Sequence, residues 1–155
     1  MTEDQSLMQR AFNEMAHNIA SLGLHTNLDV SRTLDHVTMT VRRGYADASD
    51  VIIGYTLTQE SGGDVDDVLR PEPVLTDGHG RNIECIGGPS SLGYEDGRSA
   101  WIVWFTGAEP AGQGQVELRF QQGPFVFNFA LPVAPSRLLV PRRTSEADGW
   151  RITLV

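Results

Sequence analysis

The carboxylates best spaced for chemistry lie in one acidic stretch near the middle of the chain. Asp64, Asp66 and Asp67 fall within four consecutive positions, and two prolines that argue against a continuous strand follow closely. Carboxylate oxygens clustered on a loop are ligands that suit Ca²⁺. These three aspartates are therefore the candidates for a metal site. The simpler interpretation, which we favour, is a solvated acidic loop that holds no metal.

Other reactive side chains do not assemble into a recognisable catalytic or cofactor-binding pattern. None of the four histidines has the spacing to a second histidine or a cysteine that a zinc site needs: His17, His25, His36 and His79. Ser90 and Ser91 lie in a glycine-rich stretch, but the sequence places no general base beside them. Cys85 is the single cysteine and lies in an apolar run, which indicates a small buried residue. The chain is therefore predicted to be no enzyme and to hold no cofactor.

Three aromatic residues could line a platform for a carbohydrate ring if they faced solvent together: Trp101, Trp104 and Tyr94. Trp101 and Trp104 are an odd number of positions apart, so in a strand they point to opposite faces of the sheet. At least one of them is then expected in the core. The spacing argues against a shared platform.

Composition limits the kind of protein this chain can be. With 155 residues, of which 40% are hydrophobic and 21% charged, it fits one ordered globular domain. A net charge of −8 repels a phosphate backbone, so nucleic acid is not expected as a partner. No apolar run reaches the roughly 18–20 residues of a membrane-spanning helix, and the acidic N-terminus does not resemble a signal peptide. We expect no membrane contact by this chain itself.

Helical periodicity is confined to the N-terminus. Apolar residues recur at steps of three and four over residues 3–22, and Gly23 follows as the expected C-cap. This amphipathic helix is expected to pack on the main domain or on a partner. Residues 24–31 are predicted to be a connector, which divides the chain into a helix and connector (1–30) and a folded domain (31–155).

The domain is organised around two strands within Val37–Leu57. Apolar and polar residues alternate from Val37 to Val41, a pattern typical of a strand with one buried face. The polar residues 46–50 form the predicted turn. The second strand is apolar on both faces and is predicted to be central in its sheet. Further along, the Asp77-Gly78 pair between apolar segments predicts a hairpin turn.

The remaining strands complete a sheet structure. The run 100–106 is apolar on both faces, and segments 116–120 and 125–129 form the clearest predicted hairpin. Residues 87–97 are predicted to be a glycine-rich loop, and Trp150, Ile152 and Leu154 suggest one last strand. About seven short strands without alternating helices predict an all-β, Ig-like antiparallel sandwich. A jelly roll or other barrel is the alternative.

Three segments carry recognisable structural motifs: LDHVTMTVRRGYADASDVIIGYTL, then LTDGHGRNIECIGG, and then QVELRF leading to FVFNFALPV. Together they resemble a bacterial family of unknown function, the Ig-like extracytoplasmic domain of membrane-bound anti-sigma-factor-like proteins. The resemblance covers residues 33–133. The ending EADGWRITLV, which includes residues 146–155, also looks like the opening strand of another such domain.

The resemblance implies a non-enzymatic sensor or protein-interaction domain that is held outside the cytoplasm by a membrane-anchored parent. A protein partner is expected, and a homodimer could form through an edge strand or through the helical stripe. The alternative is a surface module that binds carbohydrate or Ca²⁺. The motifs that carry the resemblance are structural, so they identify no ligand-binding residue.

Overall fold

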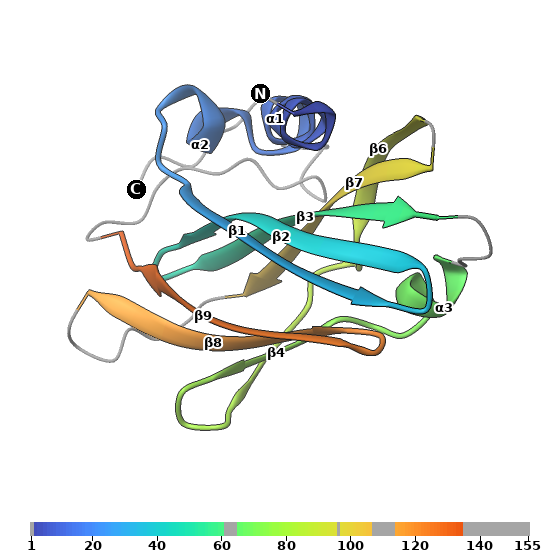
Figure 1. Cartoon of the computed structure of the whole chain (residues 1–155). Helices are drawn as coiled ribbons and strands as arrows, with labels where there is room; N and C mark the ends of the chain where they lie inside the picture. The colour runs from blue at the N-terminus through green and yellow to red at the C-terminus, as the bar shows by residue number, and fades with distance from the viewer. Residues whose placement is uncertain (1, 61–64, 96, 107–113, 135–155) are drawn as a thin grey trace.

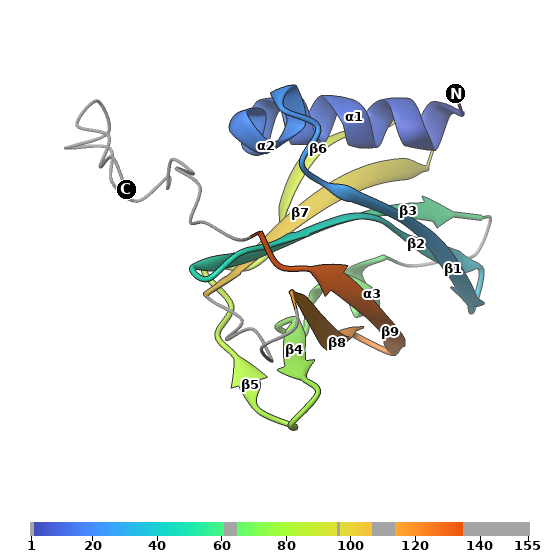
Figure 2. The same ribbon diagram turned by 90° about the vertical axis from the view of Figure 1, so that its left-hand side faces the viewer.

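Three layers make up the part of the chain that the structure, a computed structural model, describes: residues 2–60, 65–95, 97–106 and 114–134. Two antiparallel sheets face one another, and the N-terminal helices lie on the outer face of one of them (Figures 1 and 2). The elements are α1 (Glu3–Met15), α2 (His17–Ser21), β1 (Thr26–Leu34), β2 (Val37–Ala46), β3 (Asp50–Gln59), α3 (Asp66–Leu69), β4 (Val74–Asp77), β5 (Asn82–Ile83), β6 (Ser90–Glu95), β7 (Arg98–Thr106), β8 (Gln115–Gln122) and β9 (Phe125–Pro132).

Strand order confirms the predicted Ig-like sandwich. One sheet has the order β1-β2-β3-β7-β6 and the other β5-β4-β8-β9, with antiparallel pairing throughout. When β1 is left out, these orders are A-B-E-D and C′-C-F-G of an immunoglobulin domain. An additional parallel bridge joins Ala46 at the end of β2 to Val133 after β9, and it ties the two sheets together.

The described ranges contain nine strands, whereas the sequence predicts about seven. Two of the unexpected strands are β1, which occupies most of the predicted connector, and β6, which lies in the predicted glycine-rich loop. Both are edge strands of the five-stranded sheet. An edge strand can remain largely exposed, as β1 does from Asp29 to Leu34, so it need not carry the alternating apolar residues that reveal a buried strand. The prediction of loop structure was wrong at both places for this reason.

The predicted hairpins are otherwise confirmed. β2 pairs with β3, β4 with β5, and β8 with β9. β3 lies in the middle of its sheet, as its two apolar faces indicate, and every residue from Asp50 to Leu57 is buried. The suggested last strand at Trp150–Leu154 and the segment 145–155 lie outside the described residues.

The N-terminal helix is two helices, with a break at Ala16, where the sequence predicts one continuous helix. A capping box between Thr2 and Gln5 begins α1. At the end of α2, the amides of Gly23 and Leu24 bond to the carbonyls of Ala20 and Ile19, which is the Schellman pattern, and Gly23 has a φ of +64°. The predicted cap at Gly23 is therefore confirmed.

Helix α1 buries its apolar stripe against the five-stranded sheet. Phe12 and Met8 lie over Gly54 of β3, where an added Cβ would approach Phe12 Cε1 to 2.5 Å and Met8 Sδ to 2.7 Å. Glycine at this position lets the helix sit directly on the sheet. The stripe is therefore occupied within the chain, which leaves the edge strand as the predicted route to a homodimer.

Two apolar clusters result from this layering. The larger fills the space between the sheets and contains Tyr55, Phe105 and Phe120, whose rings meet in tilted and edge-on contacts. The smaller lies between the helices and the five-stranded sheet and contains Phe12, Ile52 and other residues of both layers. The five-stranded sheet is thus covered on both faces.

Asp77 closes the β4–β5 hairpin. One carboxylate oxygen accepts hydrogen bonds from the amides of His79 at 2.8 Å and Arg81 at 3.0 Å, and Arg81 Nε donates to the other oxygen at 2.9 Å. Burial acts to raise the pKa of Asp77, but the amides of Arg81 and His79 together with the Arg81 guanidinium lower it. The ionised form is therefore the form that the folded hairpin stabilises.

Replacing Asp77 by alanine is expected to lower the free energy of unfolding by about 2 kcal/mol at pH 7, because a charged acceptor of three hydrogen bonds is lost. The pKa is lower in the folded than in the unfolded chain, so this contribution is present above about pH 4 and is lost as the pH falls through the folded-state pKa. Urea unfolding of both proteins at pH 7 and pH 3 measures this difference. Glu84→Ala, at an exposed position nearby, is the control. A cost of Asp77→Ala that does not change with pH would contradict the role of the charge.

Candidate functional site

Two of the three candidate metal ligands lie within the described residues. Asp66 and Asp67 are exposed in α3, and Asp67 lies 3.7 Å from Arg70 in an ion pair between exposed side chains. Asp64 lies outside the described residues. Within the described ranges, no group of three His, Cys, Asp or Glu side chains is placed to hold a metal ion.

The tryptophans lie on opposite faces of β7, as their spacing predicts. Trp101 packs towards the cluster between the sheets and donates its Nε1–H to Ser99 Oγ at 2.8 Å. Trp104 packs against the cluster beneath the helices. Both are partly buried. Because they lie on opposite faces of the strand, the two side chains cannot share one platform. The side chain of Tyr94 lies outside the part of the chain that is described.

Cys85 is partly buried, and its backbone bridges to Phe105. Burial raises the pKa of its thiol, with a further rise from Glu72 and an opposing hydrogen bond from Gly88. The thiol form is therefore favoured, as expected of a packing residue and not of a nucleophile.

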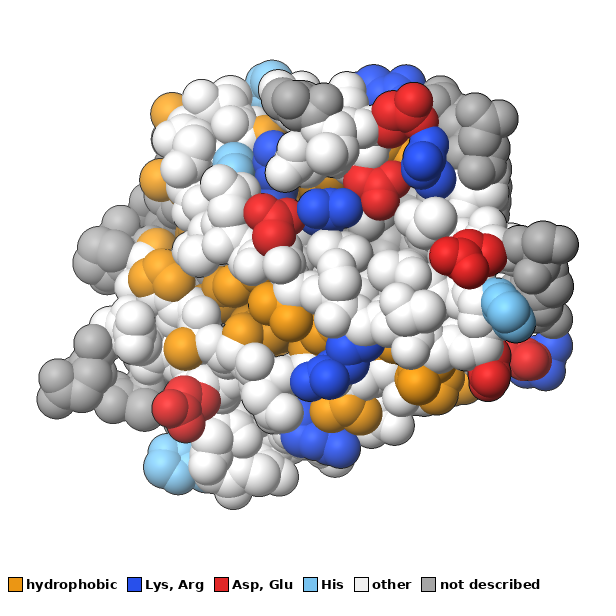
Figure 3. All heavy atoms as spheres, viewed as in Figure 1, with side chains coloured by type: hydrophobic (Ala, Val, Ile, Leu, Met, Phe, Trp, Pro, Cys, Tyr) orange, Lys and Arg blue, Asp and Glu red, His pale blue; other side chains and the backbone are white. Residues whose placement is uncertain are grey.

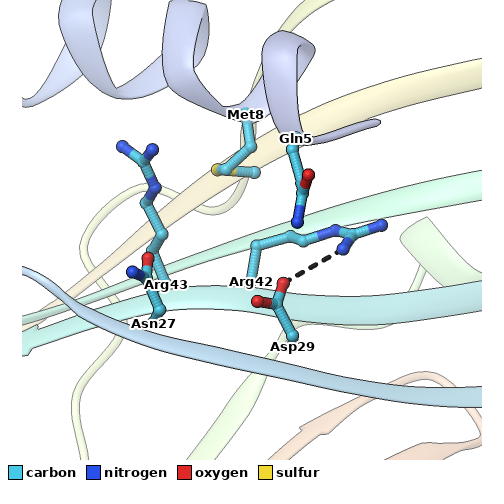
Figure 4. Close-up of a pocket in the computed structure, with 6 residues that line it drawn as sticks. All are labelled: Gln5, Met8, Asn27, Asp29, Arg42 and Arg43. Carbon is cyan, nitrogen blue, oxygen red and sulfur yellow. Dashed lines mark hydrogen bonds and ion pairs between the residues drawn. The ribbon is translucent and has the colours of Figure 1, made fainter. Parts of the chain in front are cut away.

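A pocket of about 240 Å³ lies where α1 meets β1 and β2 (Figure 4). Its lining comes from all three elements and contains one apolar residue among polar and charged ones: Gln5, Met8, Asn27, Asp29, Arg42 and Arg43. Figure 4 shows Met8 and Gln5 pointing from the helix towards the sheet, with Arg43 rising beside Met8 and the side chain of Arg42 running along the sheet beneath Gln5. Figure 3 shows acidic and basic side chains gathered beneath the helices on this face of the molecule.

Two irregularities in the strands build this pocket. Consecutive side chains of a regular strand point to opposite faces. The register of β2 against β3 shifts between Val41 and Arg43, so Arg42 is the extra residue of a bulge and lies on the same outer face as Arg43. The register of β1 against β2 shifts between Asn27 and Val30, where Asp29 has a φ of +51°. Bulges of this kind re-aim side chains and are frequent beside functional sites.

Arg42 is held by carboxylates on both sides. Its Nη1 lies 3.0 Å from Asp29 Oδ1 and its Nη2 lies 3.3 Å from Asp4 Oδ2. Asp4 also pairs with Arg98, at 3.2 Å, and Arg98 contacts Glu3. This network joins the start of α1 to β2 and β7, and it leaves Arg42 with its charge compensated.

Arg43 differs from its neighbour. Its guanidinium carbon lies 5.3 Å from the centroid of the Phe12 ring, a cation–π arrangement. On the same ring, His25 packs edge-on at 5.7 Å between centroids. Burial lowers the pKa of His25, and the positive charge of Arg43 lowers it further. Burial also lowers the pKa of Arg43, although Asp29 acts in the opposite sense.

Sequence reasoning missed this site because it treated β2 as a regular strand, with Arg42 on the polar face. The available signal was the Arg42-Arg43-Gly44 run, in which two adjacent long polar side chains interrupt the alternation. Gly44 restores the inward face, since an added Cβ there would lie 2.7 Å from Leu131 Cδ2. A break in alternation before a tightly packed glycine is compatible with a bulge.

The fold defines this chain as an Ig-like β-sandwich with an added edge strand and a helical layer. No protein-family model and no curated protein matches it. A solved structure described as "The crystal structure of the conserved domain protein from Bacillus anthracis" is 18% identical, with a TM-score of 0.46 over 74% of this chain. The chain covers 44% of that protein, and a likeness of this degree supports no inference about function.

No helix in the described ranges is long and apolar enough to cross a membrane.

Proposed function

We propose that this chain is a non-enzymatic sensor or protein-interaction domain that works outside the cytoplasm as part of a membrane-anchored regulator, as the sequence resemblance implies. The observation that carries the interaction role is the exposed edge strand β1. The segments that carry the resemblance lie in β2–β3, β4–β5 and β8–β9, so β1 is an addition to the framework that they form.

β1 has the properties of a strand that can accept a partner strand. Among the described strands it pairs with β2 alone, and its residues from Asp29 to Leu34 are all exposed. The bulge beside Asp29 disrupts its first half, but pairing is regular from Val30 to Leu34. An extended peptide that adds to such an edge gains main-chain hydrogen bonds and can place alternate side chains in neighbouring pockets.

Apolar side chains accompany this edge. Val30 and Leu34 pair with the inward-facing Val41 and Val37 of β2, yet 38% and 43% of their surfaces remain exposed. Leu28 and Phe129 are partly buried beside them. Figure 3 shows hydrophobic side chains at the surface between β1 and β9, where the two sheets diverge. A partner strand beside β1 would cover this apolar surface and so gain hydrophobic stabilisation in addition to backbone pairing.

Site-specific photo-crosslinking in cells tests the proposal. A photoreactive residue at Val30 is expected to crosslink one protein, whereas the same residue at Val74, which is 41% exposed on β4, is expected to give no such product. Adding Leu34→Lys should reduce the Val30 crosslink about tenfold or more, because a charge replaces an exposed leucine that the partner strand would cover. Equal crosslinking from Val74, or no effect of Leu34→Lys, would contradict the proposal. A captured partner that is cytoplasmic would contradict the location.

A further inference from the structure

We propose that the pocket between α1, β1 and β2 binds a small organic monocarboxylate, held by the guanidinium of Arg43 and by the carboxamides of Asn27 and Gln5. This inference does not depend on strand pairing at β1, and its test needs no partner protein.

Arg43 supplies the reason to expect an anion. It is partly buried, and its guanidinium makes no hydrogen bond or ion pair with any residue in the described part of the chain. A guanidinium carries five N–H donors, and donors that face a pocket without a protein acceptor are open to a ligand oxygen. Phe12 compensates part of the guanidinium charge through its ring face, but a ring offers no acceptor to the N–H groups. A ligand oxygen in the pocket would supply such an acceptor.

The charges around Arg43 favour a single negative charge on the ligand. Asp29 is paired with Arg42, so Arg43 is the cation of the lining that has no ion pair with a residue in the described part of the chain. Asp29 and Asp4 already engage Arg42, so the free donors are those of Arg43. A carboxylate matches the planar fork of a guanidinium and can accept two parallel hydrogen bonds from it. A phosphate dianion would bring a second charge close to Asp29.

The rest of the pocket limits the size of the ligand. Its volume of about 240 Å³ is below the range of about 300–1,000 Å³ typical of sites for drug-sized molecules. Asn27 offers both a donor and an acceptor, and Gln5 offers its Nε2 donors, since its Oε1 accepts from the Thr2 amide in the capping box; this suits a hydroxyl or amide substituent. Met8 provides an adaptable apolar wall beside Arg43. The lining therefore fits a short carboxylate with one polar group.

Titration with lactate, glycolate, acetate and inorganic phosphate tests the inference on the full chain by NMR. At least one of the carboxylates is expected to bind with a Kd of about 1 mM or tighter, and phosphate is expected to bind more weakly. Arg43→Gln should weaken binding at least tenfold, whereas Arg119→Gln, at an exposed position of β8, should leave it unchanged. If Arg43→Gln does not fold, Asn27→Ala at an exposed position provides the second variant, with the same expected loss.

His25 gives an independent readout of where the anion binds. Because the charge of Arg43 lowers the pKa of His25, a bound carboxylate should offset that charge and raise the pKa. The imidazole titration followed by NMR is expected to move upwards on saturation in the wild type. Absence of binding by all three carboxylates, unchanged binding in Arg43→Gln, phosphate binding as tight as that of the carboxylates, or a His25 titration that does not respond would each overturn the inference.

Discussion

Phe12→Ala is expected to lower the free energy of unfolding by about 3–5 kcal/mol, since a fully buried aromatic side chain would leave a cavity. Phe12 is central to the layer between helix and sheet. It packs over Gly54, its face receives Arg43, and its edge meets His25. Truncation would therefore remove apolar burial and the support of the pocket at the same time.

The loss is expected to fall mainly on the helical layer. Among the described elements, α1 and α2 pack on the outer face of the five-stranded sheet, while the cluster between the sheets does not involve Phe12. Hydrogen exchange should accelerate in α1 and α2 before it does in β8 and β9. Asn13→Ala, at the next and exposed position of α1, is the matched control and should change stability little. Uniform acceleration across both sheets would show instead that helix and sandwich unfold as one unit.

Gln122→Leu is expected to cost about 2–6 kcal/mol, because it would remove the side-chain donor to two backbone carbonyl groups at about 1–3 kcal/mol each. Gln122 is fully buried at the end of β8. Its Nε2 donates to the carbonyls of Val68 at 2.8 Å and Pro71 at 2.9 Å, and its Oε1 accepts from Tyr55 Oη at 3.3 Å. The side chain thus joins the segment around α3 to the core of the sandwich.

Urea unfolding of Gln122→Leu measures this cost, and hydrogen exchange shows whether residues 65–71 loosen first. Leucine preserves most of the volume, so the measured loss reports the hydrogen bonds and not a cavity. Gln115→Leu, at the exposed start of the same strand, controls for the change of residue type. A loss below about 1 kcal/mol would mean that water replaces the amide at this position.

The tertiary contacts of Gln122 and Gly123 cannot be predicted from the sequence. Both are recognisable as part of a turn, and the turn between β8 and β9 is where the sequence predicts it. The sequence does not indicate that α3 lies against this turn, where a Cβ on Gly123 would come within 2.9 Å of the Val68 carbonyl oxygen. The burial of Gln122 results from that contact between distant segments, and no local sequence pattern predicts it.

The edge strands and the pocket were missed for related reasons. Alternation of apolar and polar residues shows which face of a strand is buried. β1 and β6 are edge strands, and an edge strand can form without such a pattern in its sequence. Arg42 and Arg43 share a face only because β2 is bulged against β3. A bulge is a property of a pair of strands, so one strand alone does not determine it.

Local sequence patterns are therefore sufficient to predict the framework of the fold. Period-two alternation at Val37–Val41, the Asp77-Gly78 turn and the helical stripe of residues 3–22 each depend on neighbouring residues, and they were enough to predict a β-sandwich with an N-terminal helix. Three features depend on how the folded segments pack: the helices cover the sandwich, β1 extends its edge, and Arg43 faces a pocket beside Asn27. These features arise where distant segments meet, because burial and charge compensation depend on which surfaces pack together.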